Sequence, residues 1–160
     1  MESNTFCMGS LLPTIFSKLN FLSIQTRLTL KITGPDALGA KTSGLIEGAF
    51  FGNIGSDING FRLRHAFVKL NWSTTELLVG QFWHPMFVTG SFPGTVSFNT
   101  GAPFQPFARN PQIRITQNVG KFNLIASAME QLDFMSTGPD GASQYYLINS
   151  FIPEFNFRAE

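Results

Sequence analysis

The chain has little charge, a single cysteine and no long apolar run. Only 13% of its 160 residues are charged, about half the share that is usual in soluble domains. Because Cys7 is the only cysteine, an intrachain disulfide and a cysteine-rich metal site are excluded. No run of about eighteen apolar residues occurs, which excludes a single membrane-spanning helix but leaves a transmembrane β-barrel open, since barrel strands are short and alternating.

Charge and motifs give little indication of chemistry. A formal net charge of +1 provides no basic stripe, so we predict no nucleic-acid partner. The segment Gly34–Thr42 is close to a phosphate-binding P-loop, but Ala40 is inserted before the lysine and a strand pattern follows where a helix is required. His65 and His84 have no carboxylate at metal-ligand spacing. We therefore predict no enzyme activity, no cofactor and no metal.

Alternation with period two predicts strands along most of the chain after residue 23. Four hairpins are expected, each a pair of alternating runs joined by Gly, Pro, Asn or Ser-Thr turn residues. Arg62 and Arg64 share parity with Val68 and Leu70, which indicates a bulge or a position beyond the apolar band. The predicted runs are 27–33 with 43–52, 61–72 with 75–82, 112–116 with 122–128, and 145–150 with 154–160.

The fold class is therefore all-β with about eight antiparallel strands. One face of most strands is strongly apolar and the other mixes charges and amides, as in a barrel with lipid outside and water inside. If the sheet closes, the charged residues of the polar face would line a lumen: Arg27, Lys31, Glu47, Lys69, Arg114, Glu154 and Arg158. A soluble β-sandwich alternates in the same way, so the pattern alone favours neither architecture.

Two further segments bear on this choice. Trp83–Asn110 is a loop of unusual length, rich in Pro, Gly and Phe, and loops of that length are uncommon without a function. Residues 1–23 contain an apolar patch but have Glu2 before it and no basic residue until Lys18. This start does not have the pattern of a signal peptide, which a barrel protein needs for export.

Four blocks in order resemble the outer-membrane porins of Bacteroidetes, akin to the trimeric DcaP-like porins. They are Thr26–Gly44 (TRLTLKITGPDALGAKTSG), Gly60–Trp72 (GFRLRHAFVKLNW), Gly80–Pro85 (GQFWHP) and Gly101–Gln112 (GAPFQPFARNPQ). Residues 1–23 show no clear resemblance. The resemblance shifts the balance to an antiparallel up-and-down transmembrane β-barrel.

The resemblance implies about sixteen strands around a water-filled lumen, assembled as a trimer, with a long loop folded inward to narrow each pore. Trp83–Asn110 is then the candidate constriction loop, with Arg62, Arg64 and Arg109 as candidate charges near it. Ala49 replaces the acidic residue expected two positions after Glu47 in this family, which leaves the local pore charge open.

These inferences divide the chain into residues 1–23, of unclear role, and a partial barrel domain, residues 24–160. About eight strands are half of such a barrel, so we expect the chain to be a fragment of a larger one. The predicted function is passive diffusion of small hydrophilic solutes across the bacterial outer membrane, with lipid around the barrel and a homotrimer as the full-length form. The alternative is a soluble or surface β-sandwich that binds glycans through aromatic residues of the long loop.

Overall fold

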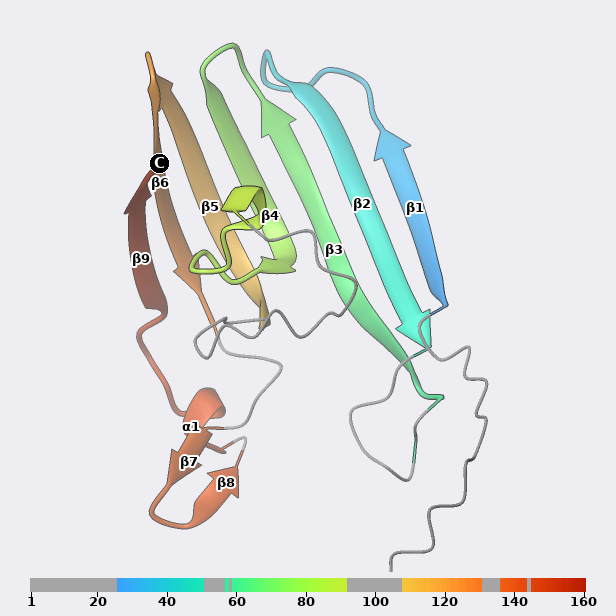
Figure 1. Cartoon of the computed structure of the whole chain (residues 1–160), viewed down its shortest axis with the longest axis vertical. Helices are drawn as coiled ribbons and strands as arrows, with labels where there is room; N and C mark the ends of the chain where they lie inside the picture. Colours follow the sequence, from blue (N-terminus) through green and yellow to red (C-terminus); the bar gives the residue numbers. More distant parts are fainter. Residues whose placement is uncertain (1–25, 51–56, 58, 92–107, 131–135, 144) are drawn as a thin grey trace, which may run out of the picture.

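Seven antiparallel strands form one large sheet in the computed structural model of the chain (Figure 1). The structure describes residues 26–50, 57, 59–91, 108–130, 136–143 and 145–160. The order of neighbours in the sheet follows the chain, β1-β2-β3-β4-β5-β6-β9. Its strands are β1 (Arg27–Thr33), β2 (Lys41–Phe50), β3 (Phe61–Asn71), β4 (Thr75–Trp83), β5 (Arg109–Val119), β6 (Phe122–Met129) and β9 (Glu154–Ala159).

The connections differ at the two ends of the sheet. Residues 34–40, 72–74 and 120–121 make short turns at the upper end in Figure 1. The links from β2 to β3, from β4 to β5 and from β6 to β9 leave from the opposite end of the sheet and are longer in sequence. Glycine residues allow two of these short turns, because Gly39 and Gly120 have φ values of 73° and 66°, which side chains other than glycine rarely adopt. The meander of hairpins thus has one end with tight turns and one end with long loops.

Three of the four predicted hairpins are confirmed, and the fourth is wrong in its first half. The segment 145–150 is not a strand, since Tyr145–Ile148 forms the short helix α1. Its apolar run is too short for periodicity to separate a strand from a helix. A small hairpin, β7 (Ser136–Gly138) with β8 (Gly141–Ser143), precedes it and was not predicted. The partner of β9 is therefore β6 and not the residues just before it.

A β-bulge in the β2–β3 pair confirms one of the two explanations for the parity of the arginines. Glu47 lies opposite His65, but Gly48 lies opposite Leu63, so Arg64 is the extra residue. The β3–β4 pairing ends nearby, at Ala66 opposite Gln81. The side-chain amide of Gln81 donates to the carbonyl oxygens of Leu63 (3.2 Å) and Arg64 (3.1 Å). The Gln81 amide thus supplies hydrogen bonds to two carbonyls just beyond the last β3–β4 pair.

Strands β3 and β4 approach each other closely at Gly80. This residue has a φ of 131°, and a Cβ atom there would lie 2.2 Å from the carbonyl oxygen of Ala66. Both the backbone conformation and the space therefore require glycine. The close approach lies beside the bulge, where β3 and β4 diverge toward the long-loop end (Figure 1).

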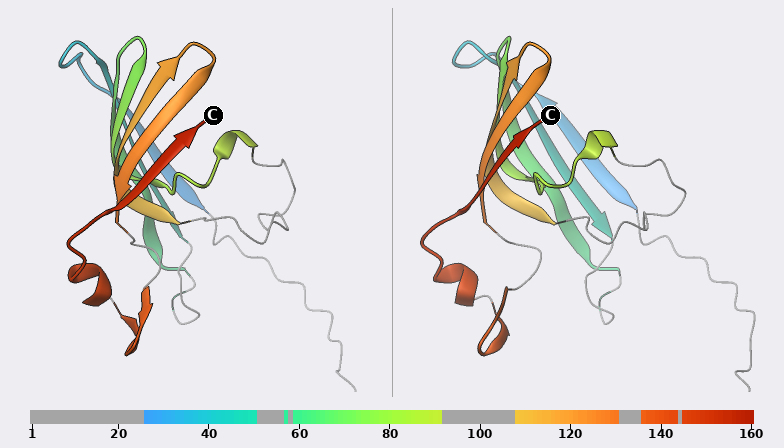
Figure 2. Two further views of the ribbon diagram at one scale, coloured as in Figure 1. Left: turned by 90° about the vertical axis from the view of Figure 1, so that its left-hand side faces the viewer. Right: turned by 60° about the vertical axis from the view of Figure 1, so that its left-hand side comes forward.

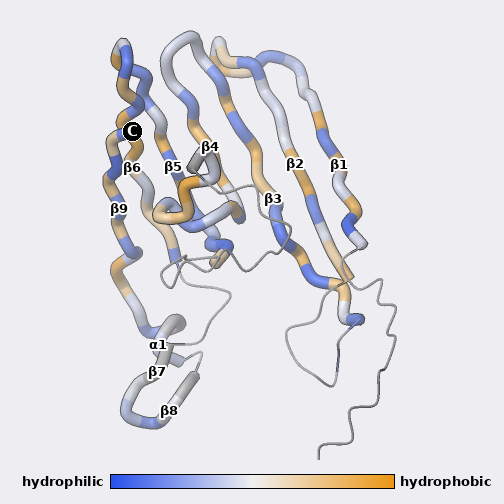
Figure 3. Tube along the Cα trace, viewed as in Figure 1, coloured by the Kyte–Doolittle hydropathy of each residue, from blue (hydrophilic) through white to orange (hydrophobic). Residues whose placement is uncertain are grey.

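Burial in the sheet is inverted relative to a soluble protein. Figure 3 shows apolar and polar residues alternating along the strands, and the register between strands places the apolar residues on one face. These side chains keep 44–79% of their surface exposed: Leu28, Leu30, Ile32, Ile46, Val68, Val79, Ile113, Ile115, Leu124, Phe155 and Phe157. The buried residues are largely polar ones of the other face, including Arg64, His65, Gln112, Arg114 and Ser127. Within the described residues, the outer edges of β1 and β9 have no neighbouring strand.

Candidate functional site: the polar face of the sheet

The register of the sheet places the seven predicted lumen residues on one face, which we call the polar face. Thr29 on β1 lies opposite Glu47 on β2, and Glu47 lies opposite His65 on β3. Phe67 and Lys69 follow His65 at even spacing on β3, so they share its face. The same alignment continues through Leu78 opposite Arg114. On one face of an antiparallel sheet, directly paired residues point the same way. Arg27, Lys31, Glu47, Lys69, Arg114, Glu154 and Arg158 all fall on this face.

The polar face carries charged residues beyond the seven predicted to line a lumen. Lys41 opposite Asn71, Glu76 opposite Thr116, and Glu160, whose backbone bonds to Asn123, lie on it as well. Lys41 lies outside the predicted run 43–52, so only the register between strands places it on this face, whereas alternation within 154–160 already groups Glu160 with Glu154 and Arg158. The described strands therefore carry more basic than acidic side chains on this face: Arg27, Lys31, Lys41, Arg62, Arg64, Lys69, Arg114 and Arg158 against Glu47, Glu76, Glu154 and Glu160.

The first part of the long loop lies on the polar side of the sheet. Figure 2 shows residues 84–91 leaving the end of β4 and running back along the sheet on the side toward which its edges curve. We call residues 84–91 the inward segment; it ends in a single 3₁₀ turn, Thr89–Ser91. Residues 92–107, the rest of the predicted constriction loop, lie outside the described residues, and Trp83 and Asn110 belong to β4 and β5.

Hydrogen bonds join the inward segment to β9, on the other side of the polar face. His84 Nε2 lies 3.4 Å from Glu154 Oε1, and the Arg158 guanidinium donates to the carbonyl oxygen of Pro85. The backbone nitrogen of His84 donates to the carbonyl oxygen of Ala108 at 2.9 Å. Because β9 is far along the chain from β4, these contacts hold the segment across the sheet.

A set of buried hydrogen bonds supports the root of the inward segment. Arg114 donates to the carbonyl oxygen of Trp83 at 2.7 Å and to Gln112 Oε1 at 2.9 Å. Gln112 in turn donates to the carbonyl oxygens of Phe82 and Trp83, both at 3.0 Å. The carbonyl groups at the end of β4 thus have charged and amide donors on β5, which satisfies polar groups that are largely out of water.

Two ion pairs on the polar face differ in burial. Arg64 Nε lies 2.6 Å from Glu47 Oε1, and the two side chains are only 7% and 15% exposed. Lys69 Nζ lies 2.8 Å from Glu76 Oε2, with 27% and 31% of the side chains exposed. The bulge explains the first pair, since it turns Arg64 to the same side as Glu47 although alternation would place it on the apolar side.

The three predicted constriction charges are not all placed together. Arg62 lies opposite Ala49 on the polar face, and Arg64 pairs with Glu47 in the bulge. Arg109 begins β5, is buried, and has its guanidinium carbon 4.3 Å from the centroid of Trp83, at the root of the inward segment. Arg64 and Arg109 therefore lie near the place where the chain leaves β4, and their role in a constriction stays a prediction.

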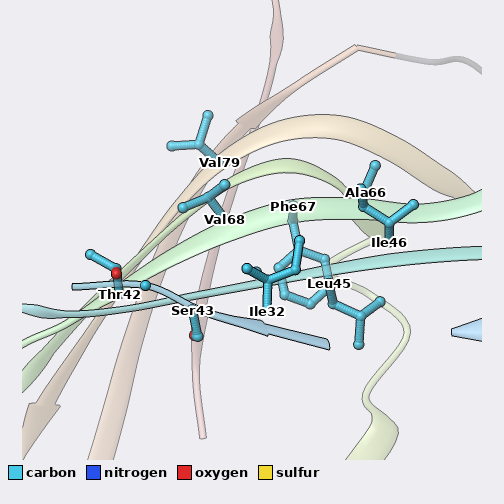
Figure 4. Close-up of a pocket in the computed structure, with 11 residues that line it drawn as sticks. Ile32, Thr42, Ser43, Leu45, Ile46, Ala66, Phe67, Val68 and Val79 are labelled. Carbon is cyan, nitrogen blue, oxygen red and sulfur yellow. The ribbon is translucent and has the colours of Figure 1, made fainter. Parts of the chain in front are cut away.

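The opposite, apolar face contains an open groove across β1 to β4. Figure 4 shows Ile46, Ala66, Val68 and Val79 on one side of the strands, and Ser43 and Leu45 on the other. Gly44 is part of the lining, and a Cβ atom there would lie 3.8 Å from the Cβ atom of Ile32. The groove belongs to the apolar face and contains none of the predicted lumen charges.

The described residues contain no group of three or more His, Cys, Asp or Glu side chains arranged to hold a metal ion. No helix among them is both long and apolar enough to cross a membrane.

Comparison with known proteins gives one informative similarity. The chain is similar to an outer-membrane channel. The crystal structure of the outer membrane channel DcaP of Acinetobacter baumannii superposes with a TM-score of 0.56 and 26% sequence identity. The match covers 72% of this chain and 32% of the channel, so the chain spans about a third of that protein's length. No protein-family model and no curated protein matches the chain.

The similarity supports the sequence interpretation at a coarse level. The similarity agrees with an antiparallel up-and-down sheet that resembles part of a porin barrel. It also agrees with a porin-like function at the outer membrane. Closure of the barrel, the Bacteroidetes origin, the trimer and the fragment nature of the chain stay predictions.

Proposed function

We propose that this chain forms part of the wall of an outer-membrane channel through which small hydrophilic solutes diffuse. The observation that carries the proposal is the inverted burial of the sheet: large apolar side chains on one face are exposed, while Arg64, His65 and Arg114 on the other are buried. Lipid on the apolar face and a water-filled lumen on the polar face give each face its preferred environment. Similarity to the DcaP channel supports the same arrangement.

The alternative, a soluble glycan-binding sandwich, has less support. A sandwich packs the apolar faces of two sheets against each other. In the described part of the chain, the one large sheet keeps its apolar face exposed, from Leu28 on β1 to Phe157 on β9. In water, a contiguous apolar surface of this extent would lead to aggregation.

The connections indicate an orientation in the membrane. Outer-membrane barrels have short turns on the periplasmic side and longer loops on the extracellular side. We infer that the turns at residues 34–40, 72–74 and 120–121 face the periplasm. The inward segment then enters the lumen from the extracellular side, where it narrows the path for solutes.

The charge of the polar face sets the expected selectivity. Its described part carries more Arg and Lys than Glu side chains. Lys41 lies opposite Asn71, and Arg114 lies between Leu78 and Ser127 of the neighbouring strands. A lumen lined mainly by basic side chains favours anions. We therefore propose that anions pass more readily than cations of the same size. Assembly as a homotrimer within the lipid is part of the same proposal.

Planar-bilayer recordings of the full-length protein test the proposal. We expect stepwise conductance increases after insertion, and a reversal potential under a KCl gradient that corresponds to chloride selectivity. Replacing Lys31 and Lys69 by glutamate should shift the reversal potential toward potassium. Folded protein that inserts into lipid but gives no conductance steps would refute the channel, whereas conductance without anion preference would refute only the selectivity.

A further inference from the structure

The inward segment begins with a tight turn that is closed by the side chain of its first residue. The turn spans residues 84–87, and the backbone nitrogen of Phe87 donates to the carbonyl oxygen of His84 at 2.9 Å. Pro85 stands at the second position, where proline is favoured because its ring fixes φ. The backbone nitrogen of Met86 donates to His84 Nδ1 at 3.2 Å. The His84 ring therefore accepts the bond that an Asp or Asn side chain commonly accepts in turns.

These contacts assign the proton of a neutral His84 to one ring nitrogen. Nδ1 accepts the hydrogen bond of Met86, so it must be without a proton. The proton of the neutral ring then lies on Nε2, which is 3.4 Å from Glu154 Oε1 on β9 and donates to it. The neutral ring thus closes the turn through one nitrogen and joins it to β9 through the other.

A second proton on the His84 ring is incompatible with this arrangement. In an imidazolium both ring nitrogens are donors. Nδ1–H would then face the backbone N–H of Met86, and the hydrogen bond that closes the turn would be lost. Stronger attraction to Glu154 compensates little, because its side chain is 55% exposed and ion pairs open to water contribute little.

The charges around the turn oppose the same proton. Arg114 and Arg158 donate to the carbonyl oxygens of Trp83 and Pro85, the residues on either side of His84. A proton on His84 therefore adds positive charge to a region that is already mainly basic. The titratable and charged groups that pack here, among the described residues, are Arg109 and Arg114 on β5, Arg158 on β9 and His65 on β3, against Glu154 and Glu160 on β9.

We propose that His84 is a pH switch, whose protonation releases the inward segment from β9. Loss of the Met86 bond opens the turn at residues 84–87, and the contacts of His84 with Glu154 and of Pro85 with Arg158 depend on that turn. Because the docked segment requires a neutral ring, a fall in pH favours the released segment. The inference rests on the proposed function, in which the docked segment narrows the lumen.

Planar-bilayer recordings of the full-length protein at different pH values test the switch. Conductance and current noise should rise as the pH falls, with a midpoint between about pH 5 and 8, where histidine changes its charge. The rise should be comparable to that caused by Arg158→Met at neutral pH, because both changes free the same segment. Carboxylates titrate lower, near about pH 4, so they contribute little in this range. Conductance that stays constant across the range would overturn the proposal.

Substitutions of His84 separate its two roles. His84→Asn keeps an acceptor for the Met86 N–H but cannot gain a proton, so its conductance should stay low and quiet throughout the range. His84→Lys keeps a positive charge opposite Glu154 but has no acceptor, so its conductance should be high and noisy throughout. If His84→Asn does not fold, His84→Ser provides an acceptor of the same kind. A pH response that survives in His84→Asn, or quiet conductance of His84→Lys, would contradict the switch.

The other histidine provides a matched control. His65 and His84 are the two histidines of the chain, and the His65 ring lies 5.1 Å from that of Trp83. His65→Gln removes this second group that can titrate in the same pH range and should leave the response unchanged. A response that disappears in His65→Gln and persists in His84→Asn would place the switch at His65 and overturn the proposal.

Hydrogen exchange of the full-length protein in detergent micelles separates the failure of this inference from the failure of the channel. The amides of Met86 and Phe87 make the two hydrogen bonds of the turn. Comparison with His84→Asn at the same pH removes the intrinsic pH dependence of exchange. At the acidic end of the range, the wild-type amides should exchange about five-fold faster or more, as expected for the loss of one hydrogen bond. Faster exchange in a protein that gives no conductance keeps the switch and refutes the channel. Equal exchange in a protein that conducts refutes the switch and keeps the channel.

Discussion

Replacing Ile115 by arginine places a charge on the apolar face, near the middle of the interior strand β5. Ile115 is 48% exposed, and the next residue, Thr116, points to the polar face opposite Glu76. The pair Ile115→Arg and Thr116→Arg therefore introduces the same side chain at adjacent positions on opposite faces. Any difference in stability between the two variants therefore comes from what surrounds each face and not from placing an arginine in β5.

Lipid and water around the apolar face predict very different changes in the free energy of unfolding for Ile115→Arg. If lipid covers the apolar face, arginine near the bilayer midplane should lower the free energy of unfolding by about 2–4 kcal/mol, which is roughly a 30- to 1000-fold change in the folding equilibrium. If water covers it, a half-exposed surface substitution should change stability by about 0.5 kcal/mol or less. Thr116→Arg gains a carboxylate neighbour in Glu76 and should be neutral or slightly stabilising.

Urea titration of the full-length protein in phosphatidylcholine vesicles, followed by tryptophan emission, measures both variants. The result that would refute the reasoning is an equal, small effect of the two substitutions. A large loss for Thr116→Arg with none for Ile115→Arg would mean that the two faces have been assigned in reverse.

The remaining predictions concern an ion pair, a close backbone contact and the inward segment. Glu47→Gln leaves the buried charge of Arg64 without its partner and should cost about 3–5 kcal/mol of unfolding free energy, measured by the same titration. Gly80→Ala brings a Cβ atom to 2.2 Å from the Ala66 carbonyl oxygen at a φ of 131° and should cost about 3 kcal/mol or more. Arg158→Met removes the hydrogen bond to the inward segment, worth about 1.5–3 kcal/mol for a charged donor, and should raise single-channel conductance and its noise.

Each of these changes has a matched control. Glu76→Gln breaks the more exposed ion pair and should cost at most about 1 kcal/mol; an equal loss for Glu47→Gln would contradict the role of burial. Gly90→Ala introduces a Cβ atom that has no neighbour within 4 Å among the described residues and should fold normally. Glu160→Gln removes an ion pair of the same arginine at 2.9 Å and should leave conductance unchanged, so an equal rise in both variants would show that the inward segment is not held as described.

Much of the fold could be predicted because a strand shows its two faces directly in the sequence. The run from Arg27 to Thr33 alternates without interruption, and β1 has the same bounds. The shared parity of Arg62 and Arg64 with Val68 also indicated the bulge that the register shows. Local alternation is a property of neighbouring residues, so it needs no knowledge of what lies across the sheet.

Features that depend on distant residues could not be predicted in this way. The start of β5 at Arg109 was missed, because Pro111 cannot donate a ladder hydrogen bond and argues against a strand. The contact of His84 with Glu154 joins residues 70 positions apart, and nothing in either local segment indicates it.

Under the proposed function, the outer edges of β1 and β9 have a consequence for how the sheet would enter a membrane. Within the described residues, each edge presents backbone N–H and C=O groups to no neighbouring strand. In hydrocarbon, each such group costs several kcal/mol when it lacks a partner, whereas in water it is solvated and can pair with another chain. If the sheet lies in the outer membrane as proposed, insertion and edge pairing must occur together, and the kinetic barrier to insertion then lies in pairing these edge groups rather than in burying the apolar side chains.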